Sequence, residues 1–166
     1  MKLYLNTAER KERIIKILLF ALNVAVAGLI WWFSAQNADE SGSMSDSIVY
    51  AIVKATAGRG VSEKTVMTIT EMLTFYFRKF AHFFIYTVFS VTMFSFIRRF
   101  RIKKISMPFI SSAICILYAI SDEIHQYFVP GRSCEARDVF IDSCGILTGL
   151  VIIYLIKRIK LKFKKV

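Results

Sequence analysis

Ten polar side chains of the kinds used for proton transfer, ion pairing and ligand binding occur within or beside the apolar stretches of this sequence. They form three groups, and the first of these has spacings of three and four residues, which places its members on one face of a helix. The first group is Lys79, His82 and Tyr86; the second is Asp122, Glu123, His125 and Gln126; the third is Arg132, Asp138 and Asp142.

Three kinds of chemistry fit these residues. His82 with Asp122 or Glu123 would supply a general base and the carboxylate that orients it, while a cation stabilises developing negative charge. Alternatively, His82, His125 and Glu123 would hold a divalent metal ion, although Asp-Glu-x-His lacks the spacing of the zinc-peptidase motif His-Glu-x-x-His. Lys79 and Arg132 beside hydrogen-bond acceptors would also suit a phosphate or sugar headgroup.

A purely structural role remains open for each of these residues. Lys79 and Arg132 would then neutralise Asp122, Asp138 or Asp142 in a buried ion network that specifies packing and performs no chemistry. The sequence contains no obvious nucleophile, and it identifies no cofactor. Whether the protein is an enzyme therefore stays undecided at this stage.

The elements that must position these groups are membrane-spanning helices. The chain has 166 residues, is 55% hydrophobic and has a mean hydropathy of +0.50, which is far more apolar than a soluble domain of this size. We expect an all-α, integral-membrane four-helix bundle made from one domain, residues 1–166. The predicted spans are 14–35, 80–97, 107–128 and 139–156, with an outer segment at 36–79.

The third span is too short if only its uninterrupted apolar run is counted. Met107 to Ile120 is 14 residues, or about 21 Å of helix against a hydrocarbon core of about 30 Å. The helix must therefore continue through the run SDEIHQ and stop near Pro130. This places the acidic pair Asp122 and Glu123 within the outer part of the membrane.

The outer segment 36–79 gives weaker signals. Its first part, QNADESGSMSDS, is typical of a loop, and a short apolar segment follows at Ile48–Val53. Ser62 is a suitable N-cap for a helix with an apolar face that would lie along the membrane surface and continue into the second span. A simple covering loop is an equal alternative. The expected face is Val66, Ile69, Leu73 and Tyr76.

The fourth span carries Asp138, Asp142, Gly145 and Gly149 at spacings of three and four, so the acidic residues continue a seam of small residues suited to close helix packing. Of three cysteines, Cys134 and Cys144 would lie near the outer face, where a bridge between them is geometrically feasible.

The distribution of basic residues predicts the orientation. Of 23 Lys and Arg residues, sixteen fall in the blocks 2–16, 98–104 and 157–165, which flank the spans. Basic residues in short loops stay on the cytoplasmic side, so both termini should be cytoplasmic and the polar groups should face outward. We attribute the net charge of +11 to topology and contact with anionic membrane lipids rather than to nucleic-acid binding.

Two segments, RKFAHFFIYTVFS and SDEIHQYFVPGRSCEARDVFIDSCGILTG, resemble the VanZ family of bacterial membrane proteins. The family pattern includes Lys-x-x-His-x-x-x-Tyr, then Ser-Asp-Glu-x-His-Gln-x-Phe-x-Pro-x-Arg, then Asp-x-x-x-Asn-x-x-Gly, and Ser34 and Gln36 also fit it. Asp142 stands where the family has Asn, which adds an acidic group. The matching positions are Lys79, His82, Tyr86, Asp122, Glu123, His125, Gln126, Pro130, Arg132, Asp138 and Gly145.

The resemblance implies a multi-pass protein of the bacterial cytoplasmic membrane and a link to resistance against the glycopeptide teicoplanin. One hypothesis is an envelope protein whose outward polar pocket binds a lipid headgroup or lipid-linked envelope precursor and limits glycopeptide access. The alternative is a membrane-embedded enzyme acting on a lipid-linked cell-wall component. A channel has less support, because the cytoplasmic halves of all spans are apolar.

Overall fold

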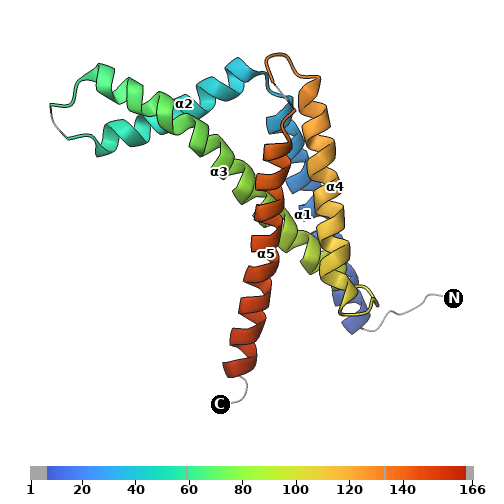
Figure 1. Cartoon of the computed structure of the whole chain (residues 1–166). Helices are drawn as coiled ribbons and strands as arrows, with labels where there is room; N and C mark the ends of the chain where they lie inside the picture. Colours follow the sequence, from blue (N-terminus) through green and yellow to red (C-terminus); the bar gives the residue numbers. More distant parts are fainter. Residues whose placement is uncertain (1–6, 59, 133, 164–166) are drawn as a thin grey trace.

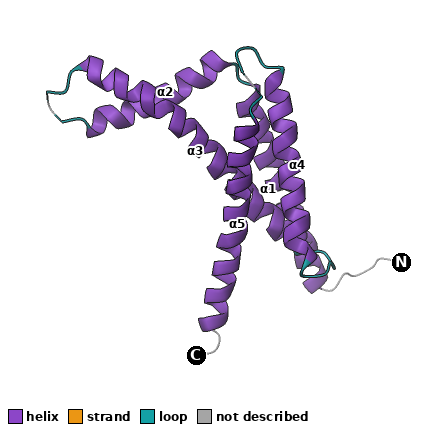
Figure 2. Cartoon of the chain, in the orientation of Figure 1, coloured by secondary structure: helices purple, strands orange, loops and turns teal. Residues whose placement is uncertain are grey.

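The protein is built from α-helices. The computed structural model describes residues 7–58, 60–132 and 134–163, and every regular element in these ranges is helical (Figure 2). Four of the five helices, α1, α3, α4 and α5, are long and apolar enough to cross a membrane, which confirms the predicted all-α fold. The helices are α1 (Thr7–Ala35), α2 (Ala38–Thr56), α3 (Glu63–Ile97), α4 (Ser106–Tyr127) and α5 (Ala136–Phe163).

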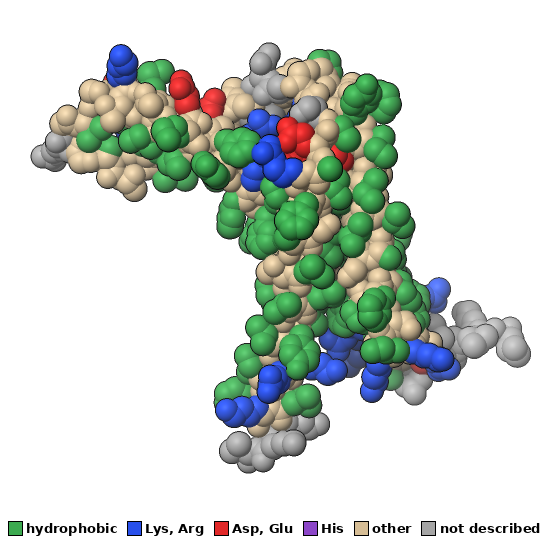
Figure 3. Space-filling model, in the orientation of Figure 1, with side chains coloured by type: hydrophobic (Ala, Val, Ile, Leu, Met, Phe, Trp, Pro, Cys, Tyr) green, Lys and Arg blue, Asp and Glu red, His purple; other side chains and the backbone are tan. Residues whose placement is uncertain are grey.

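The four long helices pack as a bundle in which α3 crosses the others obliquely (Figure 1). The first turn of α1, the connection from α3 to α4 and the last turn of α5 lie at one end, and the connection from α4 to α5 lies at the other (Figure 1). The basic blocks therefore gather at one end, where Figure 3 shows many Lys and Arg side chains. We call this the basic end, and the opposite end the polar end.

Helix α4 has the length that the membrane arithmetic requires. It begins at Ser106, continues through the acidic run and ends at Tyr127, giving 22 residues, or about 33 Å. The chain then turns through residues 128–132, and Gly131 adopts a positive φ of 75° that L side chains rarely tolerate. The predicted extension of this helix through the acidic run is therefore confirmed.

The loop expected at residues 36–47 is wrong for most of its length, because residues 38–56 are helical. They form helix α2, which pairs with the first half of α3 into an arm that projects sideways from the polar end (Figure 1). Val49 and Val53 of α2 pack against Val66 of α3 in a small core of their own. Burial of this apolar stripe outweighs the weak helix propensity of the serine- and glycine-containing sequence, which suggested a loop.

Helix α3 begins where the N-cap prediction places it, because the Ser62 hydroxyl accepts from the Thr65 backbone N–H at 3.2 Å. The predicted apolar face is divided, however. Val66 is buried, whereas Ile69, Leu73 and Tyr76 are exposed, and the buried side continues through Thr70 and Thr74. Both threonine hydroxyls donate to the carbonyl one turn earlier at 2.9 Å. The buried face therefore carries small side chains whose hydroxyl groups are hydrogen-bonded within the helix. The large apolar residues point outward.

The closest helix pair is α3 against α5, and the predicted small-residue seam lies between them. Gly145 and Gly149 are buried, and a Cβ added at Gly149 would lie 2.7 Å from the Thr87 carbonyl oxygen. The Thr87 hydroxyl donates to the Gly145 carbonyl at 3.1 Å, and Ser90 donates to the Ile146 carbonyl at 2.8 Å. Close backbone approach and these two hydrogen bonds fix the register of α5 on α3.

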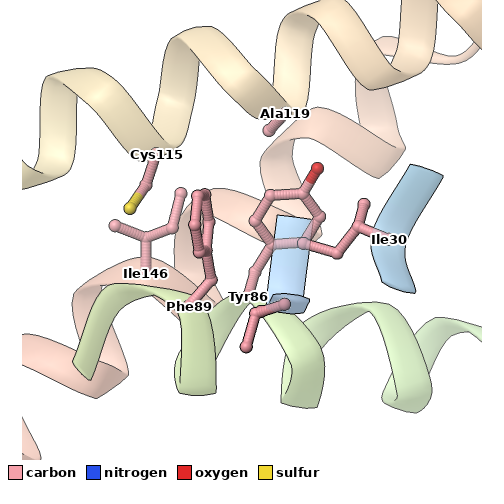
Figure 4. Packing of buried hydrophobic residues seen from close by; sticks show 7 residues of the cluster. Ile30, Tyr86, Phe89, Cys115, Ala119 and Ile146 are labelled. Atoms are coloured by element: carbon pink, nitrogen blue, oxygen red, sulfur yellow. The ribbon is translucent and has the colours of Figure 1, made fainter. Parts of the chain in front are cut away.

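A hydrophobic core beneath the polar end joins all four long helices. Figure 4 shows Tyr86 and Phe89 of α3 between Ile30 of α1 and Ile146 of α5, with Ala119 and Cys115 of α4 above them. The Tyr86 side chain is fully buried, and its ring lies edge-on to Phe89 at 6.3 Å between centroids. The bridge considered for the outer cysteines is not formed, since Cys134 and Cys144 are both free thiols.

Candidate functional site

The last turns of α4 bury two adjacent carboxylates at the polar end. Asp122 and Glu123 are each only 2% exposed, although neighbouring residues on a helix point about 100° apart. Both are buried because α4 is covered on one side by α1 and on another by α3 and α5. An ionised group at this depth carries an energetic penalty that pairing must offset.

Gln126 connects Asp122 to α1. Its side-chain amide donates to the Asp122 carboxylate at 3.2 Å and to the Ser34 hydroxyl at 3.3 Å. Its carbonyl oxygen accepts from the Arg132 guanidinium at 3.2 Å. The last turn of α4, the end of α1 and the loop that follows α4 are thus held in one polar network.

Arg132 closes the end of α1. Its guanidinium donates to the backbone carbonyls of Gln36 at 3.0 Å and Phe33 at 3.1 Å, which the helix end leaves without helical partners. The pKa of Arg132 lies below its ordinary value. The main cause is burial away from water, and the second is the positive charge of Arg78. The side chain has partners for three of its five N–H donors, and all three partners are neutral.

Glu123 positions the same loop from the other side. One carboxylate oxygen accepts from the backbone N–H of Glu135 at 2.6 Å, immediately before α5 begins. The other oxygen has no hydrogen-bond partner among the residues described. Glu123 is therefore engaged in holding the connection between α4 and α5.

Lys79 and Asp138 form an ion pair between α3 and α5. The Lys79 ammonium donates to both carboxylate oxygens of Asp138, to the second of them at 2.6 Å. The same ammonium lies 5.3 Å from the centre of the Phe75 ring, and the Arg137 guanidinium lies 5.5 Å from it. Contacts of this kind add cation–π attraction to the ion pair.

His82 lies next to Asp142, deeper in the bundle. The Nδ1 atom of His82 is 3.5 Å from the Asp142 carboxylate, which is too long for a good hydrogen bond. His82 therefore has Asp142 as its nearest acidic neighbour, instead of the Asp122 or Glu123 considered from the sequence. Asp142 is 1% exposed, and Tyr86 below it belongs to the hydrophobic core.

His125 is separated from this group. Its ring stacks on Trp31 of α1, with centroids 3.8 Å apart and planes 16° from parallel. Among the described residues, no three His, Cys, Asp or Glu side chains come close enough to hold a metal ion. The alternative metal set of His82, His125 and Glu123 is thus not assembled, because His125 stacks on Trp31 of α1 whereas His82 lies beside Asp142 of α5.

Unpaired polar atoms gather at this end of the bundle. Each is buried and lacks a hydrogen-bond partner among the described residues, a situation that typically costs about 1–3 kcal/mol per group. Clusters of such atoms are typical of functional sites rather than of packing alone. They are His82 Nδ1, Tyr86 OH, Asp122 Oδ1, Glu123 Oε2, His125 Nε2 and Asp142 Oδ1.

A pocket of about 180 Å³ opens at the polar end, between α3, α4, α5 and the loop that joins the last two. A larger hollow of about 570 Å³ lies near the basic end, but its lining comes from α5 alone and forms no enclosed site. The pocket is lined by Phe75, Arg78, Lys79, Gln126, Gly131, Arg132, Glu135 and Asp138.

The sequence model of the VanZ/LLP1 family matches residues 18–157. The chain belongs to the VanZ/LLP1 family. The match runs from α1 into the last turns of α5 and includes every residue of the polar end named above. No curated protein and no solved structure matches this VanZ/LLP1 chain.

The ten sequence-predicted residues of the VanZ/LLP1 chain fall into four places. Four sequence-predicted residues line the pocket, namely Lys79, Gln126, Arg132 and Asp138. Four lie behind it, namely His82, Tyr86, Asp122 and Asp142, while Glu123 holds the loop and His125 stacks on α1.

Four lining residues, Phe75, Arg78, Gly131 and Glu135, were not predicted as site residues. Phe75 precedes the first segment that resembles the family, whereas Arg78, Gly131 and Glu135 lie within the two segments at positions that the family pattern leaves unspecified. A helical projection offers one signal for Phe75, which lies four residues before Lys79 and so shares its face. Arg78 points to the pocket only because the loop after α4 folds back toward α3, which local spacing does not reveal.

Proposed function

We propose that this VanZ/LLP1 protein is a non-enzymatic protein of the bacterial cytoplasmic membrane, with both termini in the cytoplasm. Its outward polar end would bind the headgroup of a membrane lipid or lipid-linked envelope precursor and thereby limit access of glycopeptides such as teicoplanin. The observation that carries the proposal is the pocket of about 180 Å³, which joins cationic side chains to hydrogen-bond acceptors at one end of the spanning helices.

Three features support an outward pocket at headgroup depth. The basic blocks lie at the opposite end and would be retained in the cytoplasm. Trp31 and Trp32, on the last turns of α1 at the pocket end, are half exposed, as indole rings at a membrane interface commonly are. Arg132 binds the end of the same helix, so the pocket lies at the level of these rings.

Binding of radiolabelled teicoplanin to cells tests the proposal. Cells producing the protein should bind less teicoplanin than cells lacking it, because an occupied or shielded precursor offers fewer sites. Asp122→Asn should lose the protection at equal protein level, since the network of Gln126 and Arg132 is built on that carboxylate. Asp46→Asn, on the exposed side of α2, is the matched control and should behave like the wild type.

A membrane-embedded enzyme is the second candidate. The observation that favours it is the close approach of His82 to Asp142, with unpaired carboxylate oxygens of Asp122 and Glu123 at the same end. Lipid and peptidoglycan profiles of the same two strains separate the candidates. A new lipid-linked species in the deletion strain would favour the enzyme, whereas identical profiles with unequal teicoplanin binding favour the binding protein.

A further inference from the structure

The described lining of the pocket contains three cations, Arg78, Lys79 and Arg132, and two acids, Glu135 and Asp138. Both oxygens of Asp138 are taken by Lys79. One carboxylate oxygen of Glu135, the other acid in the lining, accepts from the Arg137 guanidinium at 2.6 Å, and Arg137 is not part of the lining. The two arginines of the pocket are therefore not the cations with which these acids pair.

Arg78 and Arg132 face the same cavity without carboxylate partners of their own. Arg78 is half buried, and it makes no hydrogen bond or ion pair with any side chain that the structure describes. Among the described residues, Arg132 donates to two backbone carbonyls and the Gln126 amide oxygen, and two of its five N–H donors have no partner there. Two like charges that share a partly buried cavity repel one another unless an anion lies between them.

We propose that Arg78 and Arg132 together bind a phosphoryl group in this pocket, and that its source is the headgroup of a membrane lipid. Guanidinium groups bind phosphate oxygens through paired, charge-assisted hydrogen bonds. The inference rests on the proposed function, because it names the chemical group that the pocket recognises. From the sequence, Lys79 and Arg132 were the cations expected to bind a headgroup. Arg78 now takes the place of Lys79, because the Lys79 ammonium already forms an ion pair with Asp138.

The Lys79–Asp138 pair then has a positioning role. It joins α3 to α5 directly beside Arg78, and it keeps the Asp138 carboxylate from pairing with either arginine. Arg132 is fixed in place by its three hydrogen bonds to α1 and α4. A phosphoryl group would thus meet one arginine that is already oriented and one that is free to close on it.

Ligand titration of the full-length protein, purified in an uncharged detergent, tests the inference. The probes are short-chain phosphatidic acid, diacylglycerol with the same acyl chains, and inorganic pyrophosphate, and the readout is the shift of the thermal unfolding midpoint. Phosphatidic acid should raise the midpoint and diacylglycerol should not. Arg78→Gln should weaken the apparent Kd for phosphatidic acid about tenfold or more, as the loss of a charged hydrogen bond does.

Two variants make the comparison specific. Arg98→Gln removes the same charge at the basic end and should leave the Kd unchanged. Arg132→Gln should also lose binding, but this change removes the hydrogen bonds to the end of α1 as well. Arg78→Gln is therefore the deciding variant, provided that its unfolding midpoint without ligand is unchanged. Equal shifts by phosphatidic acid and diacylglycerol, or an unchanged Kd in Arg78→Gln, would overturn the inference.

The outcomes also identify the source of the phosphoryl group. A shift with phosphatidic acid and none with pyrophosphate supports a lipid headgroup, whereas equal, Arg78-dependent shifts with both show that the pocket reads the phosphoryl group without the lipid. If binding depends on Arg78 but teicoplanin binding to cells does not change with the protein, the phosphoryl site stands and the protective function fails. Protection of cells without phosphatidic acid binding would retain the function and remove this inference.

Discussion

At the scale of residues, the polar end is organised by side chains that each link two elements. Lys79 and Asp138 join α3 to α5, Gln126 joins α4 to α1, and Arg132 joins the loop to α1. Every one of these links uses charged or amide groups that are largely withdrawn from water. Removing one partner therefore leaves the other buried and unpaired. This unpaired group destabilises the fold more than the loss of the attraction itself does.

Asp138→Asn should destabilise the protein by about 2 kcal/mol, because it leaves the Lys79 ammonium facing the pocket without its counter-charge. The free energy of unfolding in a denaturing-detergent titration measures the effect. The double variant Lys79→Met/Asp138→Leu should recover part of the loss, since neither charge is then buried alone. If the effects of Lys79→Met and Asp138→Leu, each measured alone, simply add in the double variant, the pair contributes no coupling energy and the assigned role is wrong.

At the scale of elements, α3 and α5 approach so closely that their shared seam has no room for a side chain at Gly149. The nearest obstructing atom is the backbone carbonyl oxygen of Thr87, and the Ser90 side chain follows at 2.9 and 3.0 Å. The helices must therefore separate if a methyl group is added. Their separation would move Asp138 and Asp142 away from Lys79 and His82.

Gly149→Ala should accordingly cost about 2 kcal/mol in the same titration, within the usual range for overpacking. Gly28→Ala is the matched control, because a Cβ at that position in α1 meets nothing within 4 Å and should be neutral or slightly stabilising. A Gly149→Ala protein as stable as the wild type would show that α5 shifts freely on α3.

Sequence reasoning succeeded where the answer depends only on residues that are close together in the chain. The length of α4 follows from the thickness of a bilayer, and the seam from Asp138 to Gly149 follows from helical periodicity. It failed where the answer depends on a partner distant in sequence. Helix α2 is helical because Val49 and Val53 meet Val66 of α3.

The same limit applies to the candidate site. The rotation of α3 relative to α5 and the loop brings His82 beside Asp142. It also turns Arg78 toward the pocket. Residue types and spacing identified half of the lining residues, since they place groups on helix faces. Residue types and spacing could not decide which cation forms an ion pair with an acidic side chain and which remains available to bind a ligand.

At the scale of the whole molecule, the separation of a basic end from a polar end predicts a fixed orientation. In a variant that keeps Cys134 and lacks the other two cysteines, a membrane-impermeant maleimide should label intact cells, because Cys134 is exposed in the loop at the polar end. A lone cysteine introduced as Lys103→Cys at the basic end should react only after permeabilisation. Labelling of Lys103→Cys, but not Cys134, in intact cells would reverse the proposed topology.

Helix α3 is a single helix of 35 residues that belongs to both the arm and the bundle. A thinner or thicker bilayer changes the tilt of a spanning helix to match its hydrophobic length. Since α3 has no break between the two parts, such a tilt would also raise or lower the arm and turn Arg78 and Lys79 relative to the loop after α4. Bilayer thickness is therefore a variable that this architecture would transmit directly to the shape of the pocket.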